Sequence, residues 1–160
     1  MPNIAIQPLD ASTRAWVAQT IVEQWGANVV VGHGVVYRPA ELPGFVAMLG
    51  HEHVGLLTYH IQGDACEIIT LDSFREGQGV GVALIEAVKQ AAQDAGCRRL
   101  WLITTNDNLH ALRFYQKRGF MLVALHHDAV NEARRLKPSI PLVGNDGIPI
   151  RDEIELEILF

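Results

Sequence analysis

The feature that most constrains the fold of this chain is a glycine-rich segment at residues 71–84, which reads LDSFREGQGVGVAL. An apolar run typical of a strand ends at Leu71, glycines then alternate at positions 77, 79 and 81, and helical spacing of apolar residues begins at Val80. Glycine at every second position lets the backbone curl with its N–H groups converging, and the start of a helix adds partial positive charge. The segment therefore predicts a strand, a loop that can bind an anionic phosphate group, and a helix.

The residues before this loop predict a β-meander. Apolar runs at residues 45–49, 54–61 and 66–71 are joined by spacings typical of antiparallel hairpins. Further upstream, the pattern predicts a strand closed by Pro8 and a helix that Ser12 can cap. Residues 29–42 are either a short strand or a mobile loop, because glycines and a proline interrupt them.

The residues after the loop predict alternating helices and strands. A helix is expected over residues 80–95, followed by a strand over 100–104 that is apolar enough for burial on both faces. Asn106 or Asn108 can cap a second helix that ends at Arg118, and a strand follows over 120–125. An acidic strand over 154–160 is expected at an edge of the sheet. The order predicts an α+β fold with a mixed, mostly antiparallel sheet flanked by helices.

Composition limits the class of protein. A chain of 160 residues with 49% hydrophobic and 19% charged residues has the size and apolar content of a single domain, residues 1–160. A net charge of −5 and the shortness of its basic pairs argue against nucleic acid as a partner. No apolar run approaches the roughly 20 residues of a membrane span, and the N-terminus lacks a secretory signal pattern. We therefore expect a cytoplasmic protein with no membrane partner, whose Cys66 and Cys97 are reduced.

Two well-known nucleotide loops do not fit the glycine spacing. A Walker A loop ends in Gly-Lys-Ser/Thr, but Gly81 is followed by Val82 and Ala83, which leaves no lysine for a γ-phosphate and no hydroxyl for Mg²⁺. The dinucleotide fingerprint requires G-x-G-x-x-G/A, and Leu84 occupies its last position here. A small nucleotide-binding switch is therefore a remote alternative.

The loop resembles the pyrophosphate loop of the GCN5-related N-acetyltransferase (GNAT) family, in which Arg or Gln is followed by two residues, Gly, one residue, and Gly or Ala. Here Glu76-Gly77-Gln78-Gly79-Val80-Gly81 supplies the glycines, with Glu76 in place of Arg or Gln and Arg75 one position early. Residues 108–120, NLHALRFYQKRGF, are similar to the family's second motif of Asn, Ala, an aromatic-Tyr pair and Gly-Phe. The resemblance covers residues 44–126, and residues 127–160 form a C-terminal extension with the final strand.

The resemblance implies the GNAT fold and direct transfer of an acetyl group from the cosubstrate acetyl-coenzyme A (acetyl-CoA) to an amine. By position, the N–H of Leu71 would bind the thioester oxygen, Tyr115 would meet the sulfur, and amides of residues 77–82 would bind pyrophosphate. Glu76 cannot attract phosphate, so we expect weaker affinity or help from Arg75. Asn108 would orient the coenzyme, cap its helix, or both. The implied coenzyme site comprises Leu71, Asp72, Ser73, Glu76, Gly77, Gln78, Gly79, Val80, Gly81, Val82, Asn108 and Tyr115.

Several assignments stay open at this point. The amine must lose a proton, and Glu67 is either the general base or an ordinary solvent-facing carboxylate. No metal is expected, because the histidines, including the His51 and His53 pair, lack further ligands at a metal-binding spacing. The three tryptophans are interpreted as core residues. The acceptor amine is unidentified, although the negative charge favours a cation.

Two functional classes remain. One is an N-acetyltransferase, and the other is a non-catalytic acyl-CoA sensor or regulatory domain of the same fold. The acidic Glu76 in the loop keeps the second class open, whereas Tyr115 and Asn108 favour the first. A homodimer could form by pairing of the strand at residues 154–160 between subunits.

Overall fold

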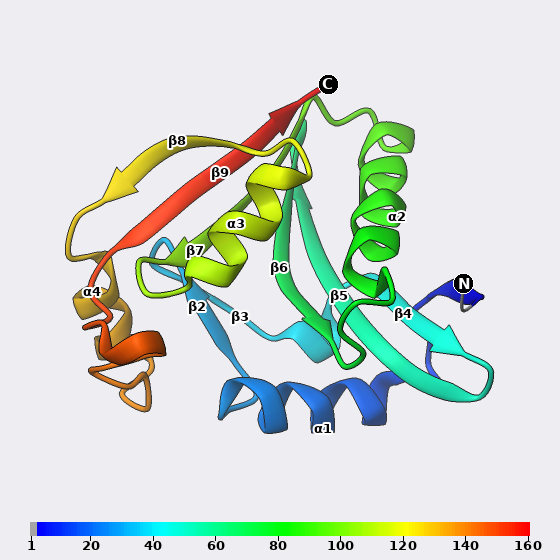
Figure 1. Cartoon of the computed structure of the whole chain (residues 1–160), viewed down its shortest axis with the longest axis horizontal. Coiled ribbons are helices and arrows are strands. Elements are labelled where there is room, and N and C mark those ends of the chain that lie inside the picture. Colours follow the sequence, from blue (N-terminus) through cyan, green and yellow to red (C-terminus); the bar gives the residue numbers. More distant parts are fainter. Residues whose placement is uncertain (1–2) are drawn as a thin grey trace.

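A mixed sheet of seven strands forms the centre of the molecule, in the order β1-β4-β5-β6-β7-β9-β8, beside a separate hairpin, β2-β3 (Figure 1). The computed structural model describes residues 3–160. All neighbouring strands are antiparallel except β6 and β7, which are parallel. The predicted fold class is therefore confirmed. The strands are β1 (Ile4–Pro8), β2 (Val30–Gly32), β3 (Val35–Tyr37), β4 (Gly44–Leu49), β5 (Glu52–Gln62), β6 (Ala65–Ser73), β7 (Arg99–Thr105), β8 (Met121–His126) and β9 (Glu153–Leu159).

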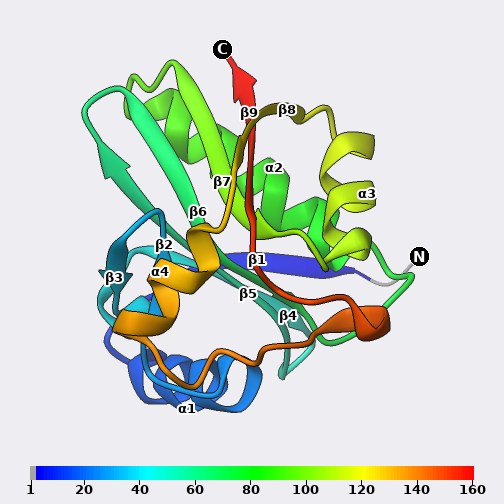
Figure 2. The ribbon, with the colours of Figure 1, turned by 90° about the vertical axis from the view of Figure 1, so that its left-hand side faces the viewer.

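Helices cover both faces of this sheet (Figure 2). On one face, here called the α2 face, α2 and α3 pack in the main core around the buried Leu84, Leu100 and Leu156. On the opposite, α1 face, Val17 and Ile21 of α1 pack against Leu56. Among the described residues, no helix is long and apolar enough to cross a membrane. The helices are α1 (Arg14–Trp25), α2 (Val80–Asp94), α3 (Leu109–Lys117) and α4 (Ala129–Leu136), with short 3₁₀ helices η1 (Pro39–Glu41) and η2 (Asn145–Gly147).

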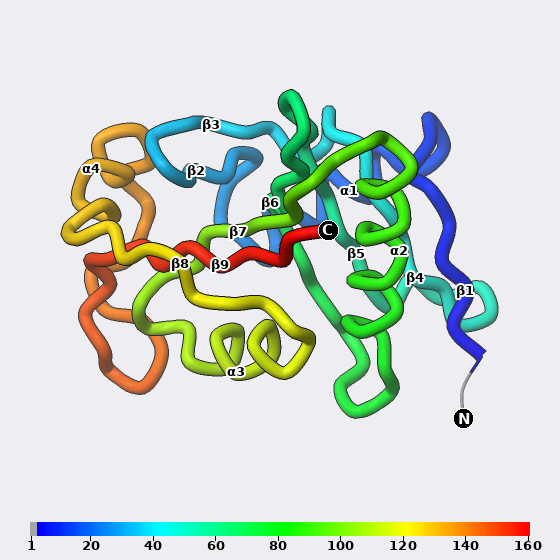
Figure 3. The backbone as a smooth tube through the Cα atoms, turned by 90° about the horizontal axis from the view of Figure 1, so that it is seen from above, coloured from blue at the N-terminus to red at the C-terminus, as the bar shows by residue number. Residues whose placement is uncertain are grey.

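The sheet opens between its two parallel strands. The pairing of β6 with β7 runs only from Ala65 and Arg99 to Ile68 and Leu102, although β6 continues to Ser73 and β7 to Thr105. Beyond that point the two strands have no ladder of hydrogen bonds between them, so their edges face a gap. The hairpin β2-β3 and helix α3 lie on opposite sides of β7 and β9 near this gap (Figure 3).

The N-terminal half differs from its prediction in two details. Ser12 does not cap α1: Thr13 occupies the cap position without a side-chain cap bond, and the Ser12 hydroxyl and N–H both donate to Asp10 instead. Residues 29–42, left open by the sequence, form the hairpin β2-β3 and the turn η1. His33 and Gly34 make the hairpin turn with positive φ values of 41° and 80°.

The strand predicted over residues 100–104 is buried on one face only. Leu100 and Leu102 are buried on the α2 face, whereas Trp101 and Ile103, on the α1 face, are partly exposed. The reason is that the hairpin β2-β3 covers the α1 face of the sheet near β7. Each of its strands has only three residues, so the hairpin is too small to exclude water completely.

The C-terminal strand is not an edge strand, so that expectation was wrong. β9 lies between β7 and β8, and β8 forms the edge of the sheet. The acidic pattern was misleading because Arg99 of β7 and His126 of β8 pair with Glu155, and Arg99 also pairs with Glu157. A central strand can therefore carry these carboxylates. The edge of residues 154–160 is not available for pairing between subunits, and α4 was not predicted.

Candidate active site

A cavity of about 580 Å³, here called the larger cavity, lies on the α2 face where β6 and β7 separate. Trp25, Ile103, His110, Phe114 and Arg118 also contribute to its wall, although no coenzyme role was predicted for them. Gln78 is the one predicted coenzyme residue that is not part of the wall. The predicted residues on the wall are Leu71, Asp72, Ser73, Glu76, Gly77, Gly79, Val80, Gly81, Val82, Asn108 and Tyr115.

The glycine loop leaves backbone donors free at this wall. Gly77 and Gly79 have φ values of 72° and 78°, a left-handed conformation that side chains other than glycine disfavour. Gly81 is needed for a different reason, since a Cβ there would lie 3.0 Å from Cζ of Phe114. No side chain caps the start of α2. The first N–H groups of α2 are therefore available to an anion, as the sequence predicted.

The positive charge beside the glycine loop comes from Arg118 and not from Arg75, the residue that the sequence suggested. Glu76 is exposed, and Arg75 forms an ion pair with Glu52 of the β4–β5 hairpin. Arg118 follows α3 and lines the cavity with its guanidinium 5.3 Å above the Phe114 ring. The Nε atom of Arg118 is buried and has no hydrogen-bond partner among residues 3–160. Arg118 was part of the quoted motif, and a basic residue beside the Tyr-containing helix was the signal that could have marked it.

Tyr115 is 8% exposed and packs edge-to-face against Phe114 and Phe120, with ring centroids 5.3 Å away in each case. Burial, with a smaller effect of the Asp72 carboxylate, raises the pKa of its hydroxyl. Burial also raises the pKa of Asp72, against the effect of a 3.0 Å hydrogen bond from Trp25 Nε1. Tyr115 is therefore a neutral hydroxyl that can donate a hydrogen bond and holds its proton firmly.

The smaller cavity lies on the α1 face, below the hairpin β2-β3, and its volume is about 120 Å³. It shares part of its wall with the larger cavity, so the two meet at the gap between β6 and β7. Asn108 lies on this shared wall and also caps α3, because its Oδ1 accepts a 3.1 Å hydrogen bond from the N–H of Ala111. The shared residues are Trp25, Ile68, Ile69, Ile103, Thr104 and Asn108.

Glu67 belongs to the wall of the smaller cavity and is 5% exposed, so its interpretation as a solvent-facing carboxylate was wrong. His33 Nε2 lies 2.9 Å from each carboxylate oxygen, and the Tyr37 hydroxyl donates to Oε1 at 2.8 Å. These hydrogen bonds to Glu67 raise the pKa of His33. Both partners come from the hairpin that the sequence left undefined, and for that reason they were missed.

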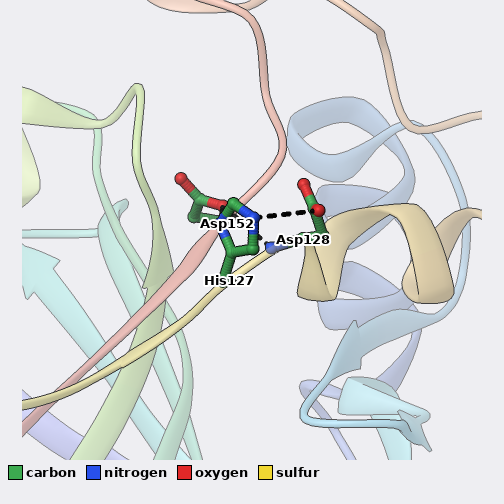
Figure 4. A group of neighbouring side chains, drawn as sticks. All are labelled: His127, Asp128 and Asp152. Carbon is green, nitrogen blue, oxygen red and sulfur yellow. Dashed lines mark hydrogen bonds and ion pairs between the residues drawn. The ribbon is translucent and has the colours of Figure 1, made fainter.

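Neither the cysteines nor the histidine pairs add a second reactive centre. Cys66 and Cys97 are free and buried, and burial raises the pKa of the Cys66 thiol to about 12, so it remains protonated. In the part of the chain that the structure describes, His127, Asp128 and Asp152 form the one group of potential metal ligands (Figure 4). Asp152 accepts the N–H of Asp128 at 2.9 Å, which fixes the start of α4. This contact explains the group as a helix-starting structure.

The profile of the Acetyltransferase (GNAT) family matches residues 11–120. The chain belongs to this family. The match confirms the resemblance seen in the glycine loop and in residues 108–120. It also extends the resemblance to the N-terminal helix, α1.

Individual relatives agree with the assignment. The uncharacterized protein YdhI of Bacillus subtilis is 44% identical over 150 residues, which cover 93% of this chain and 94% of YdhI. The spermine/spermidine N(1)-acetyltransferase of the same organism is 28% identical over 90 residues, or 52% of this chain and 59% of that protein.

Solved structures show the same fold. A GNAT family acetyltransferase from Elizabethkingia anophelis with acetyl-CoA bound matches with a TM-score of 0.74 at 19% identity, covering 100% of both chains. A Bacillus subtilis acetyltransferase in complex with CoA matches with a TM-score of 0.70 at 19% identity, covering 99% of both. This GNAT protein thus shares its whole architecture with coenzyme-binding acetyltransferases.

Proposed function

We propose that this protein is an N-acetyltransferase that moves the acetyl group of acetyl-CoA to an amine by direct attack within a ternary complex. One observation carries the proposal: a cavity with an uncapped glycine loop and a cavity with a buried carboxylate meet at the gap between β6 and β7. The coenzyme occupies the first cavity, the amine enters through the second, and the thioester lies in the gap.

The glycine loop and Arg118 hold the phosphates of the coenzyme. The free N–H groups at the start of α2 and the helix dipole favour an anion, and the unpaired Nε of Arg118 supplies a buried donor on the same wall. Arg118 thereby supplies a donor in place of the one that the family's usual Arg or Gln would provide at position 76. Arg75 contributes less, because Glu52 already neutralises it.

The N–H of Leu71 is the donor for the thioester oxygen. The N–H of Phe74 donates to the carbonyl of Val54 on β5, and hydrogen-bonded pairs alternate along antiparallel strands. Leu71 is three residues from Phe74, an odd number, so its N–H is directed away from β5. It therefore faces the side on which β7 is no longer paired with β6. A donor aimed at the developing oxyanion stabilises the transition state by electrostatics.

The amine is deprotonated and then attacks the thioester directly. Glu67 accepts a proton from the ammonium, and the amine nitrogen attacks the thioester carbon to form a C–N bond. The C–S bond breaks as the nitrogen releases its second proton to solvent, which leaves a neutral amide, and the coenzyme leaves as a thiolate that accepts a hydrogen bond from the Tyr115 hydroxyl. Because the pKa of Tyr115 is raised and that of a thiol is about 8.5, the proton stays on the tyrosine.

Calorimetric titration with acetyl-CoA, CoA, ATP and NAD tests the proposal, followed by thiol release with a panel of amines. We expect saturable binding of the two coenzyme A species only, and turnover with an amine. The relative that is a spermine/spermidine N(1)-acetyltransferase supports an amine as the acceptor. Coenzyme binding without turnover of any amine would instead favour an acyl-CoA sensor, and absence of coenzyme binding would reject both.

Tyr115→Phe separates chemistry from binding. Removing the hydroxyl leaves the ring packing intact, so we expect kcat to fall about tenfold, the effect of one lost charge-assisted hydrogen bond, while the Kd for acetyl-CoA changes less than twofold. An unchanged kcat would exclude the role of Tyr115 at the sulfur.

A further inference from the structure

Two buried carboxylates line the smaller cavity. They belong to Glu67 and Glu153, which are 5% and 3% exposed, and the basic residue beside them is His33. Buried carboxylates are normally paired with a cation, because desolvation of an isolated charge is costly. The sequence did not single out Glu153, because it lies in an acidic run in which every second residue is glutamate.

The two carboxylates differ in how far the protein satisfies them. Both oxygens of Glu67 are hydrogen-bonded by His33, and Tyr37 adds a further donor. Glu153 has only the backbone N–H of His33, which donates to Oε1 at 3.1 Å. Within residues 3–160, Oε2 of Glu153 has no hydrogen-bond or ion-pair partner. Glu153 is therefore a buried carboxylate on a cavity wall with half of its acceptor capacity unused.

His33 connects the two carboxylates, because its imidazole binds Glu67 and its N–H binds Glu153. Val30, Ile69 and Ile103 line the same cavity. The cavity thus offers an acidic group near the gap where the thioester lies, aliphatic side chains on its wall, and a second carboxylate whose Oε2 has no partner among the described residues.

We propose that the acceptor is a small aliphatic amine with a second positive charge, whose reacting nitrogen lies at Glu67 and whose non-reacting ammonium binds Glu153. This inference rests on the proposed function and names its substrate class. Glu153 is a specificity-determining residue in this arrangement, because it touches the substrate away from the reacting atoms. The volume of about 120 Å³ suits a short alkyl diamine.

Two amines of equal chain length test the inference, 1,4-diaminobutane and 1-aminopentane, which differ only in a second ammonium against a methyl group. Thiol release is measured at saturating acetyl-CoA. We expect kcat/KM for the diamine to exceed that for the monoamine about tenfold or more, as for one charge-assisted hydrogen bond in a buried site. Equal values for the two amines in the wild type would overturn the inference.

Glu153→Gln is the decisive variant, because glutamine keeps the oxygen that accepts the His33 N–H and removes only the charge. We expect its preference for the diamine to collapse to within about twofold, through the KM for the diamine and not through kcat. Glu155→Gln is the matched control: Glu155 lies on the same face of β9 but is paired with Arg99 and His126 and does not line the cavity. A retained preference in Glu153→Gln would contradict the role of Glu153.

Calorimetry on the same samples separates the two proposals. If acetyl-CoA does not bind, the proposed function fails; if it binds and neither amine is acetylated, only the substrate class is overturned. If Glu153→Gln does not fold, as judged by its thermal melt, Glu153→Asp replaces it. That variant keeps the charge but shortens its reach by one methylene, so we expect the preference to recover with 1,5-diaminopentane, and failure to recover it would overturn the inference.

Discussion

At the residue scale, the pair of His33 and Glu67 shows how a tertiary contact sets the state of a side chain. Glu67 accepts from His33 at both oxygens, and the other groups that face His33 are Glu153, Glu155 and the Tyr37 hydroxyl. All of the carboxylates favour the imidazolium, against a smaller effect of burial. His33 and Glu67 together therefore act as an ion pair that holds the hairpin to the sheet.

The titration of His33 follows from this geometry. NMR of labelled imidazole should show a midpoint above the ordinary value of about 6.5, and Glu67→Gln should move it down. Because the folded-state pKa is raised, the stabilisation by this pair is fully present below about pH 6.5 and is lost as the pH rises through the raised pKa. Glu52→Gln, which affects Arg75 instead, is the control. An unmoved midpoint in Glu67→Gln would show that the contact is not formed in solution.

Arg118 makes a second prediction at this scale. Arg118→Met keeps the packing on Phe114 and removes the buried donor, so we expect about tenfold or greater loss of affinity for CoA. Affinity for S-acetylpantetheine, which lacks the pyrophosphate, should not change. Arg113, an exposed residue of α3, does not line the larger cavity, so Arg113→Met should not change the affinity for CoA. Equal losses for the two ligands would place Arg118 away from the phosphates.

At the element scale, β9 decides how the C-terminal extension joins the fold. It pairs with β7 on one side and β8 on the other, and its Leu156 belongs to the main core. A strand in this position cannot be removed without separating β8 from the sheet. The extension that the sequence placed outside the common core is thus part of the central sheet.

Two leucines of β9 test this position. Leu156 is 0% exposed, so Leu156→Ala should lower the free energy of unfolding by about 2–5 kcal/mol through lost burial and a residual cavity. Leu159, at the end of the same strand, is 61% exposed, and Leu159→Ala should change it by less than about 0.5 kcal/mol. Urea unfolding measures both, and similar small effects would mean that β9 is not a central strand.

At the scale of the whole molecule, the site is assembled from segments that are far apart in the sequence. The hairpin supplies His33 and Tyr37, β6 supplies Glu67, and α3 supplies Tyr115. Under the proposed function, acetyl-CoA contacts the wall of the larger cavity only in the native state, so its binding must stabilise the whole fold.

Thermal unfolding measures this linkage. At a free acetyl-CoA concentration of 100 times its Kd, stabilisation should be about 2.7 kcal/mol, which raises Tm by roughly 5–10 °C for a chain of this size. ATP and NAD at the same concentration should leave Tm unchanged. A shift of equal size with ATP would indicate a general polyanion effect in place of coenzyme recognition.

The sequence by itself determined the elements whose signals are local. Apolar runs defined β4 to β7, glycine spacing defined the loop before α2, and Asn108, one of the two predicted candidates, caps α3. These features depend on backbone geometry and on neighbours within a few residues. The motifs at residues 76–81 and 108–120 lie in such features, and they were sufficient to indicate the family.

Only the tertiary structure decided the order of the strands and the composition of the smaller cavity. The insertion of β9 between β7 and β8 depends on pairing of residues far apart in the sequence, such as Arg99 and Leu159, which are 60 positions apart. The burial of Glu67 and the free oxygen of Glu153 depend on a hairpin whose own sequence is ambiguous. A sequence pattern shows which face of a strand is apolar, but long-range packing determines which charged groups that face brings together.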